Sequence, residues 1–105
     1  MAAPANDAWG QASTVTPGST ATLASVIAPA GYVVMGLIGT GTGEGYFSVR
    51  VGSLVVASGR IRSAAPTLDI ALPNGIAVAA GAQVVLAVTN EADATAAYEG
   101  TLLGA

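Results

Sequence analysis

Residues 67–89 read Thr-Leu-Asp-Ile-Ala-Leu-Pro-Asn-Gly-Ile-Ala-Val-Ala-Ala-Gly-Ala-Gln-Val-Val-Leu-Ala-Val-Thr, and this stretch decides the fold class. Large aliphatic residues recur at every second position in residues 67–72 and 83–89, the period of a strand with one buried face. Pro73-Asn74-Gly75 and Gly81-Ala82 predict turns between the apolar runs. The residues predicted to face inward are Leu68, Ile70 and Leu72 in the first run and Val84, Leu86 and Val88 in the second.

The same pattern extends outward from this stretch in both directions. Further strands are predicted at residues 20–28, 32–38, 46–51, 54–61 and 94–103. Seven to nine short strands, with turn signals about every ten residues and no helical period, predict an all-β fold. We expect an antiparallel β-sandwich, jelly-roll-like, with a closed barrel as the alternative. Residues 1–10 are expected to form an extended N-terminal arm, and residues 11–105 a single domain.

Two segments receive more specific expectations. Residues 32–38 are apolar on both faces, which predicts a central or covered strand. Its two predicted faces are Tyr32, Val34 and Ile38 on one side and Val33, Met35 and Leu37 on the other. Gly39–Gly45 carries a glycine at every second position and is expected to be a flexible loop, while Gly52-Ser53 predicts a tight hairpin turn.

The composition excludes most catalytic chemistry. The 105 residues include no His, Cys or Lys, and only 9% are charged, against about 25% in a typical soluble domain. General acid–base and nucleophilic catalysis draw mainly on the missing residue types. We therefore expect no enzyme, no catalytic residue and no cofactor. A glycosidase-type pair of carboxylates stays open as an alternative, although the chain lacks the aromatic residues that sugar-cleaving clefts use.

Two motifs contain residue types that ligand-binding sites use: the glycine-rich segment Gly39–Gly45 and the acidic residues near the last turn. Gly39–Gly45 does not end in Gly-Lys-Ser/Thr and is followed by a strand pattern, so it does not predict a phosphate loop. Glu91, Asp93 and Glu99, with Asn90, offer oxygen ligands for Ca²⁺ but do not have the spacing of an EF-hand loop. A solvated turn is the favoured interpretation, and no metal site is expected.

Charge and hydropathy limit the partners. The net charge is −3, and the only basic side chains are Arg50, Arg60 and Arg62, so nucleic acid is not an expected partner. The N-terminus has neither the basic nor the apolar region of a signal peptide, and no apolar run approaches the length of a membrane helix. We expect a protein made in the cytoplasm, with no membrane partner.

The surface instead favours assembly. A surface of Ala, Gly, Ser and Thr loses little side-chain entropy when a partner covers it, and strand edges without Lys invite partners. The expected partner contacts are Trp9 and Gln11 in the arm and Glu44 near the loop tip. Trp9 could alternatively fold back onto its own domain. The expected inter-subunit residues are Tyr32, in the core or at the contact, and Arg50, Arg60 and Arg62 as donors to carboxylates. The alternative for the arginines is an ordinary solvated strand face.

Several segments together resemble a known group of proteins. They are residues 29–39 (Pro-Ala-Gly-Tyr-Val-Val-Met-Gly-Leu-Ile-Gly), 45–51 (Gly-Tyr-Phe-Ser-Val-Arg-Val), 72–76 (Leu-Pro-Asn-Gly-Ile), 81–86 (Gly-Ala-Gln-Val-Val-Leu) and 98–104 (Tyr-Glu-Gly-Thr-Leu-Leu-Gly). In length, β-pattern, N-terminal arm and low charge, the chain resembles small virion proteins of tailed bacteriophages, such as capsid decoration (cement) proteins and fibre-tip domains.

The resemblance implies a structural role on the capsid surface of a virion. It implies a homo-oligomer, most often a trimer, that bridges adjacent subunits of the major capsid protein and stabilises the phage head. It transfers no site residues, because the group has no shared functional motif. The alternative is a receptor- or glycan-binding β-sandwich module of a phage head or tail fibre, against which the scarcity of aromatic residues counts.

Overall fold

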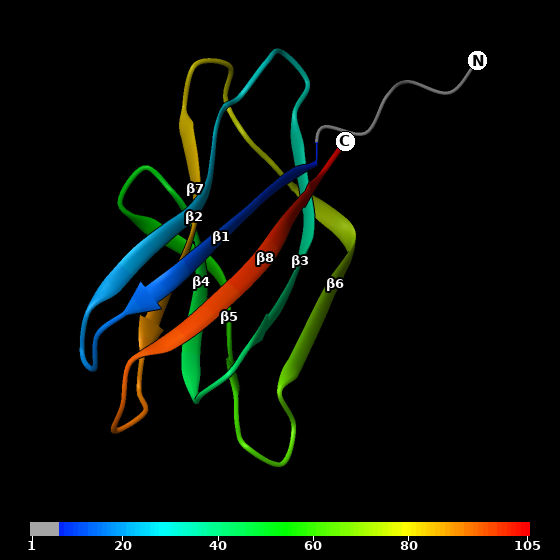
Figure 1. Ribbon diagram of the computed structural model, residues 1–105. Helices are drawn as coiled ribbons and strands as arrows, with labels where there is room; N and C mark the ends of the chain where they lie inside the picture. Colours follow the sequence, from blue (N-terminus) through cyan, green and yellow to red (C-terminus); the bar gives the residue numbers. More distant parts are fainter. Residues whose placement is uncertain (1–6) are drawn as a thin grey trace.

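Two four-stranded antiparallel sheets pack face to face in the computed structural model, which describes residues 7–105 (Figure 1). The strand order is β1-β8-β3-β6 in the first sheet and β2-β7-β4-β5 in the second. The strands are β1 (Ala8–Val15), β2 (Thr20–Ile27), β3 (Val33–Gly41), β4 (Gly45–Val51), β5 (Leu54–Ile61), β6 (Thr67–Ala77), β7 (Gln83–Asn90) and β8 (Ala96–Gly104). The predicted β-sandwich is confirmed. The closed-barrel alternative is wrong, because the strands form two separate sheets. None of the described segments forms an apolar helix of membrane-spanning length.

The core lies between the two sheets and is built from inward-facing aliphatic and aromatic side chains. The predicted inward set of β7 is confirmed, because Val84, Leu86 and Val88 are fully buried. The ring of Phe47 on β4 meets the ring of Tyr98 on β8 edge to face, with centroids 6.0 Å apart and planes at 81°. Burial of apolar surface of this kind stabilises a fold by about 25 cal/mol per Å².

Strand β3 is an interior strand, as residues 32–38 predicted, since it lies between β8 and β6. Its face assignment was wrong beyond Met35. The register with both neighbours shifts between Val34 and Gly36, so a bulge interrupts the alternation. Leu37 consequently points into the core beside Val34, and Ile38 points outward.

The Gly39–Gly45 segment is mostly strand, and the expected flexible loop is reduced to residues 42–44. Its alternating glycines share the inner face of the sandwich, where aromatic rings occupy the space of their missing side chains. A Cβ atom at Gly39 would lie 2.6 Å from Cε2 of Phe47, and one at Gly45 would lie 2.7 Å from Cε1 of Tyr98. The glycine pattern therefore reflects the close packing of rings.

Pro73-Asn74-Gly75 lies within β6, so the predicted turn was wrong. The pairing with β3 passes from Gly36↔Ala71 to Val34↔Ile76, so four residues of β6 oppose one residue of β3. Gly75 has φ = 63° in this bulge, a conformation that favours glycine. A proline fits here because β6 is an edge strand and a bulge needs no continuous ladder of N–H donors.

Part of the expected N-terminal arm belongs to a strand. Residues 1–6 lie outside the described residues, whereas Ala8–Gly10 begin β1 and pair with β8, so the domain starts before residue 11. Ala8, Gly10 and Ala12 alternate on the inner side of β1, and these small residues give no aliphatic signal in the sequence. The end of β8 lies beside the start of β1, which brings the C-terminus to that end of the sheet (Figure 1).

Candidate functional site

The outer face of the β1-β8-β3-β6 sheet presents a mixed apolar and polar surface, here named the Trp9 face. The strand register arranges its side chains in two rows. Thr101 on β8 lies between Trp9 on β1 and Ile38 on β3, and Glu99 lies between Gln11 and Thr40. Trp9 is 59% exposed and Ile38 is 38% exposed, so this face, like the outer face of the other sheet, presents large apolar side chains to solvent. The Trp9 face comprises Trp9, Gln11, Ile38, Thr40, Glu99 and Thr101.

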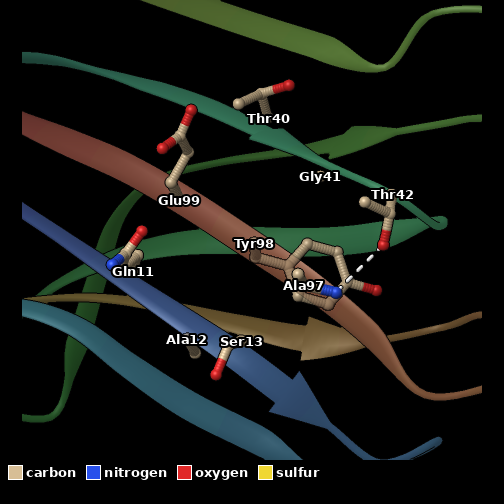
Figure 2. A pocket seen from close by; sticks show the side chains of 9 residues that line it. All are labelled: Gln11, Ala12, Ser13, Thr40, Gly41, Thr42, Ala97, Tyr98 and Glu99. Atoms are coloured by element: carbon tan, nitrogen blue, oxygen red, sulfur yellow. Dashed lines mark hydrogen bonds between the residues drawn. The ribbon is translucent and has the colours of Figure 1, made fainter.

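A shallow groove follows β8 across this face. It consists of a hollow of about 300 Å³, lined in part by Gln11 and Ala97, and a smaller one of about 80 Å³ beside Trp9. Thr40 and Glu99 line both hollows, so the two lie next to each other. Figure 2 shows Gln11, Glu99 and Thr40 on three adjacent strands at the larger hollow. The short side chain of Ala97 on the middle strand leaves this space open.

The polar side chains of the groove are largely free to bind a ligand. Among the described residues, the side chains of Gln11, Glu99 and Thr101 have no hydrogen-bond partner within the protein. The Thr40 hydroxyl donates to the Pro66 carbonyl at 3.0 Å. The Thr42 hydroxyl accepts from the Ala97 N–H at 3.0 Å, which holds the end of the groove (Figure 2).

The outer face of the β2-β7-β4-β5 sheet, here named the Arg60 face, has the opposite character. Its polar side chains bond to one another across the strands: Thr20 with Thr89 at 2.7 Å, and Gln83 to Ser25 at 3.0 Å. A row of small residues crosses its middle, and the register places them side by side. This row is Thr22, Ala87, Ser48 and Ser58.

Arginine 60 is held at the edge of the Arg60 face. Its Nε donates to Glu91 at 3.0 Å, and its guanidinium carbon lies 4.9 Å from the centroid of the Tyr46 ring. Arg50 is exposed and makes no ion pair with another described residue. Arg62 follows the end of β5 and pairs through its backbone with Ala65. Of the three expected inter-subunit arginines, Arg50 is thus the one with a free side chain on a sheet face.

Of the remaining predicted contact residues, Tyr32 and Glu44 do not line the groove of the Trp9 face. Tyr32 is 1% exposed and lies in the core, so its side chain offers no surface to a partner, and the core alternative holds. Glu44 lies in the turn between β3 and β4 and does not line the groove. Its carbonyl accepts a 2.6 Å hydrogen bond from the Tyr98 hydroxyl. Trp9 and Gln11 are the predicted contacts that the structure brings together.

The acidic residues weighed as calcium ligands are dispersed. Glu91 pairs with Arg60, and Glu99 lies on the opposite sheet. Asn90 is buried, and its amide donates to the carbonyls of Val15 at 2.7 Å and Ala94 at 3.0 Å. Within residues 7–105, no three acidic, His or Cys side chains come together as a metal site would require.

Two tyrosines have perturbed acidities for structural reasons. Burial raises the pKa of the Tyr98 hydroxyl above its usual 10.0, and the carboxylates of Glu91 and Glu44 add to the effect. Burial also raises the pKa of Tyr32, with a contribution from Asp7. Because both tyrosines are buried in the core, these shifts bear on the stability of the fold.

Four residues of the Trp9 face were not predicted from the sequence as partner contacts: Ile38, Thr40, Glu99 and Thr101. Ile38 was assigned to the same face as Val34 because the bulge at Gly36 has no clear signature. Glu99 had been grouped with the preceding acidic turn. The alternation of Tyr98, Glu99, Gly100 and Thr101 was the available signal, since it places Glu99 and Thr101 on one side of a strand.

A solved crystal structure of PirA has a similar fold. The two align with a TM-score of 0.57 over 90% of this chain and 92% of that chain, at 17% sequence identity. At that identity the likeness concerns the fold alone. No protein-family model matches the chain, and no curated protein matches it.

Proposed function

We propose that this protein is a non-catalytic structural protein of a phage virion, a decoration protein that binds the capsid surface and its own copies through the Arg60 face. The observation that carries this proposal is the row of small uncharged side chains across that face. Thr22 and Ser58 are the exposed members of this row, whereas Ser48 and Ala87 between them are buried. A flat surface of this kind costs little side-chain entropy to cover.

The surroundings of the row also suit a protein contact. Ile27 is 64% exposed and Val55 is 40% exposed, on the two edge strands of the same sheet. Val55 lies opposite the unpaired Arg50. Interfaces commonly combine apolar residues and arginine with a depletion of Lys and Glu. The apolar side chains would supply the buried area, and Arg50 a bond to a partner carboxylate.

The finer fold class belongs to the same proposal. The orders β1-β8-β3-β6 and β2-β7-β4-β5 support a jelly roll, in which eight strands form two sheets through Greek-key connections. Jelly rolls occur in viral capsid domains as well as in lectins. A decoration protein that binds only the assembled shell stabilises that shell by mass action, so the role needs no catalytic group.

The test is co-sedimentation with phage heads, together with native mass spectrometry of the free protein. The unchanged chain is expected to sediment with expanded heads and to form a homotrimer in solution. Val55→Asp places a charge in the proposed contact and should reduce head binding at least tenfold. Thr101→Asp, which introduces the same charge on the opposite face, is the matched control and should bind as the unchanged chain does. Head binding by Val55→Asp at the unchanged level would contradict the proposed contact.

The expected N-terminal arm needs a separate variant. Deleting residues 1–10 would remove Ala8–Gly10 from β1 and disturb the sheet, so it cannot isolate the arm. Deleting residues 1–6 leaves every described strand intact. If an arm contributes to docking, this shorter deletion lowers head binding without changing the free energy of unfolding.

A further inference from the structure

We propose that the groove of the Trp9 face binds a neutral carbohydrate, with Trp9 as the stacking platform. This role goes beyond capsid decoration and uses the opposite side of the sandwich, so each proposal can fail without the other. Three independent features carry it: an exposed indole, a set of unpaired hydrogen-bonding groups beside it, and the sign of the charge on the face.

The indole of Trp9 has the exposure and the setting of a ligand platform. Its side chain is 59% exposed although it lies in a regular strand with a fixed register to β8. Aromatic rings have an electron-rich face, which attracts the polarised C–H groups on the flat side of a sugar ring. Ile38 extends the apolar surface on the far side of Thr101. A ligand with one apolar face and a polar rim therefore fits this surface.

The polar groups beside Trp9 match the hydroxyl groups of a sugar. Gln11 offers an amide donor and acceptor, Glu99 two carboxylate oxygens, and Thr101 a hydroxyl. None of these side chains has a hydrogen-bond partner among the described residues. Some polar side chains of the Arg60 face bond to one another, as Thr20 does with Thr89, whereas Arg50 and Ser58 are also unpaired there within residues 7–105. The Trp9 face differs because its unpaired groups lie beside an exposed indole.

The strands fix these groups before a ligand arrives. Trp9 and Gln11 are two residues apart on β1, and Glu99 and Thr101 are two apart on β8, so all four point to the same side. The lining residues span three strands and five residues of β8 (residues 97–101), which is about 10 Å by about 13 Å from strand spacing and rise. That area accommodates one or two pyranose rings. Paired strands fix the backbone of the site, so binding does not have to order the main chain.

The charge on this face selects against anionic ligands. Glu99 lies in the groove, and Asp69 lies opposite Ile38 on β6. All the arginine side chains belong to β4, β5 or the segment directly after β5. A sialic acid, a uronic acid or a phosphate would meet the carboxylates of Glu99 and Asp69, and none of the residues that line the groove is an arginine. The ligand is accordingly an uncharged hexose or N-acetylhexosamine, free or at the end of a cell-surface polysaccharide.

The sole tryptophan makes the binding experiment direct, because the intrinsic fluorescence of the chain reports on Trp9 alone. The full chain is titrated with glucose, galactose, mannose and N-acetylglucosamine, their β-1,4 disaccharides, and N-acetylneuraminic acid. We expect a saturable emission change, with a Kd in the millimolar range, for at least one neutral sugar and none for N-acetylneuraminic acid. Isothermal titration calorimetry supplies a readout that does not depend on the indole.

Variants separate the site from the fold. Trp9→Ala should weaken sugar binding at least tenfold by calorimetry, Trp9→Tyr should retain part of the affinity, and Gln11→Ala should lower it several-fold. The matched control is Leu54→Ala, another exposed apolar side chain but on the other sheet, which should bind sugar as the unchanged chain does. Circular dichroism and urea unfolding establish that each variant is folded.

The contradicting outcomes are equally definite. The proposal is overturned if no neutral sugar binds, if N-acetylneuraminic acid binds as tightly, or if Trp9→Ala binds unchanged. It is also overturned if the Trp9 emission responds to phage heads and to no sugar, because the face would then be a protein contact. Val55→Asp distinguishes the two proposals, since it should lose head binding and keep sugar binding.

Discussion

Gly39 on β3 faces the ring of Phe47 across the core, and its hydrogen leaves the space that the ring edge fills. A Cβ atom there would lie 2.6 Å from Phe47 Cε2, so Gly39→Ala must displace the ring. Overpacking a fully buried site of this kind is expected to lower the free energy of unfolding by about 1–3 kcal/mol. Urea unfolding followed by circular dichroism measures the loss.

The control for this prediction is the double variant. Phe47→Leu shortens the side chain opposite Gly39 and leaves room for a methyl group. The cost of Gly39→Ala should therefore be smaller in the Phe47→Leu background, with a coupling of about 0.5–3 kcal/mol between the two changes. Additive losses would show that the alanine is accommodated by a movement elsewhere in the sheet.

The side chain of Asn90, the last residue of β7, connects three elements through hydrogen bonds to backbone groups. Its amide nitrogen donates to Val15, the last residue of β1, and to Ala94 in the turn before β8, and its Oδ1 accepts from the Ala92 N–H at 2.7 Å. Asn90→Ala leaves these backbone groups without their partner and should lower the free energy of unfolding by at least about 2 kcal/mol.

The same variant has a local consequence that distinguishes this connection from general packing. Amide hydrogen exchange should rise most at the end of β1 and in the turn before β8. Asn74→Ala, at an exposed asparagine in the β6 bulge, is the matched control and should change stability by less than about 0.5 kcal/mol. If amide exchange in Asn90→Ala rose equally in all strands, Asn90 would not act by connecting β7 to β1 and to the turn before β8.

The elements that the sequence predicted well are those whose buried face consists of large apolar residues. Strands β4 and β7 were located to within a residue, because Phe47 and Val49 in β4 and Val84, Leu86 and Val88 in β7 alternate with outward residues. Strand β1 was missed at its start, since Ala8 and Gly10 bury little surface, and the end of β3 was missed because glycines hold its inner positions. Pro73-Asn74-Gly75 has turn chemistry, but the sheet accommodates it as a bulge.

The candidate site depends on which strands become neighbours, and this belongs to the whole molecule. Trp9 and Gln11 were singled out from the sequence because of rarity and position. Glu99 joins them only because β8 lies between β1 and β3, and a single sequence contains no signal for that order. The separation of the arginines from the Trp9 face follows from the same topology. The sequence could therefore suggest individual surface residues, but not which of them lie together on one face of the sandwich.

The pH dependence of stability is also a property of the whole chain. With no His, Cys or Lys, no side chain titrates between the carboxylates and the tyrosines, so the free energy of unfolding should be flat between about pH 6 and pH 9. Burial raises the pKa of Tyr32 and Tyr98 above 10.0. Above about pH 10 the unfolded chain releases these protons and the folded chain retains them, so stability falls as pH rises towards the folded values.

Urea unfolding at a series of pH values from neutral to strongly alkaline measures this decline, and phenylalanine variants identify its source. Tyr98→Phe loses the hydroxyl bond to the Glu44 carbonyl, so it should be less stable at neutral pH by about 1 kcal/mol. Its alkaline decline should nevertheless be shallower, because one of the two retained protons is gone. The double variant with Tyr32→Phe should be shallower still. A decline of unchanged steepness in the double variant would place the alkaline sensitivity elsewhere, in groups that the buried rings do not explain.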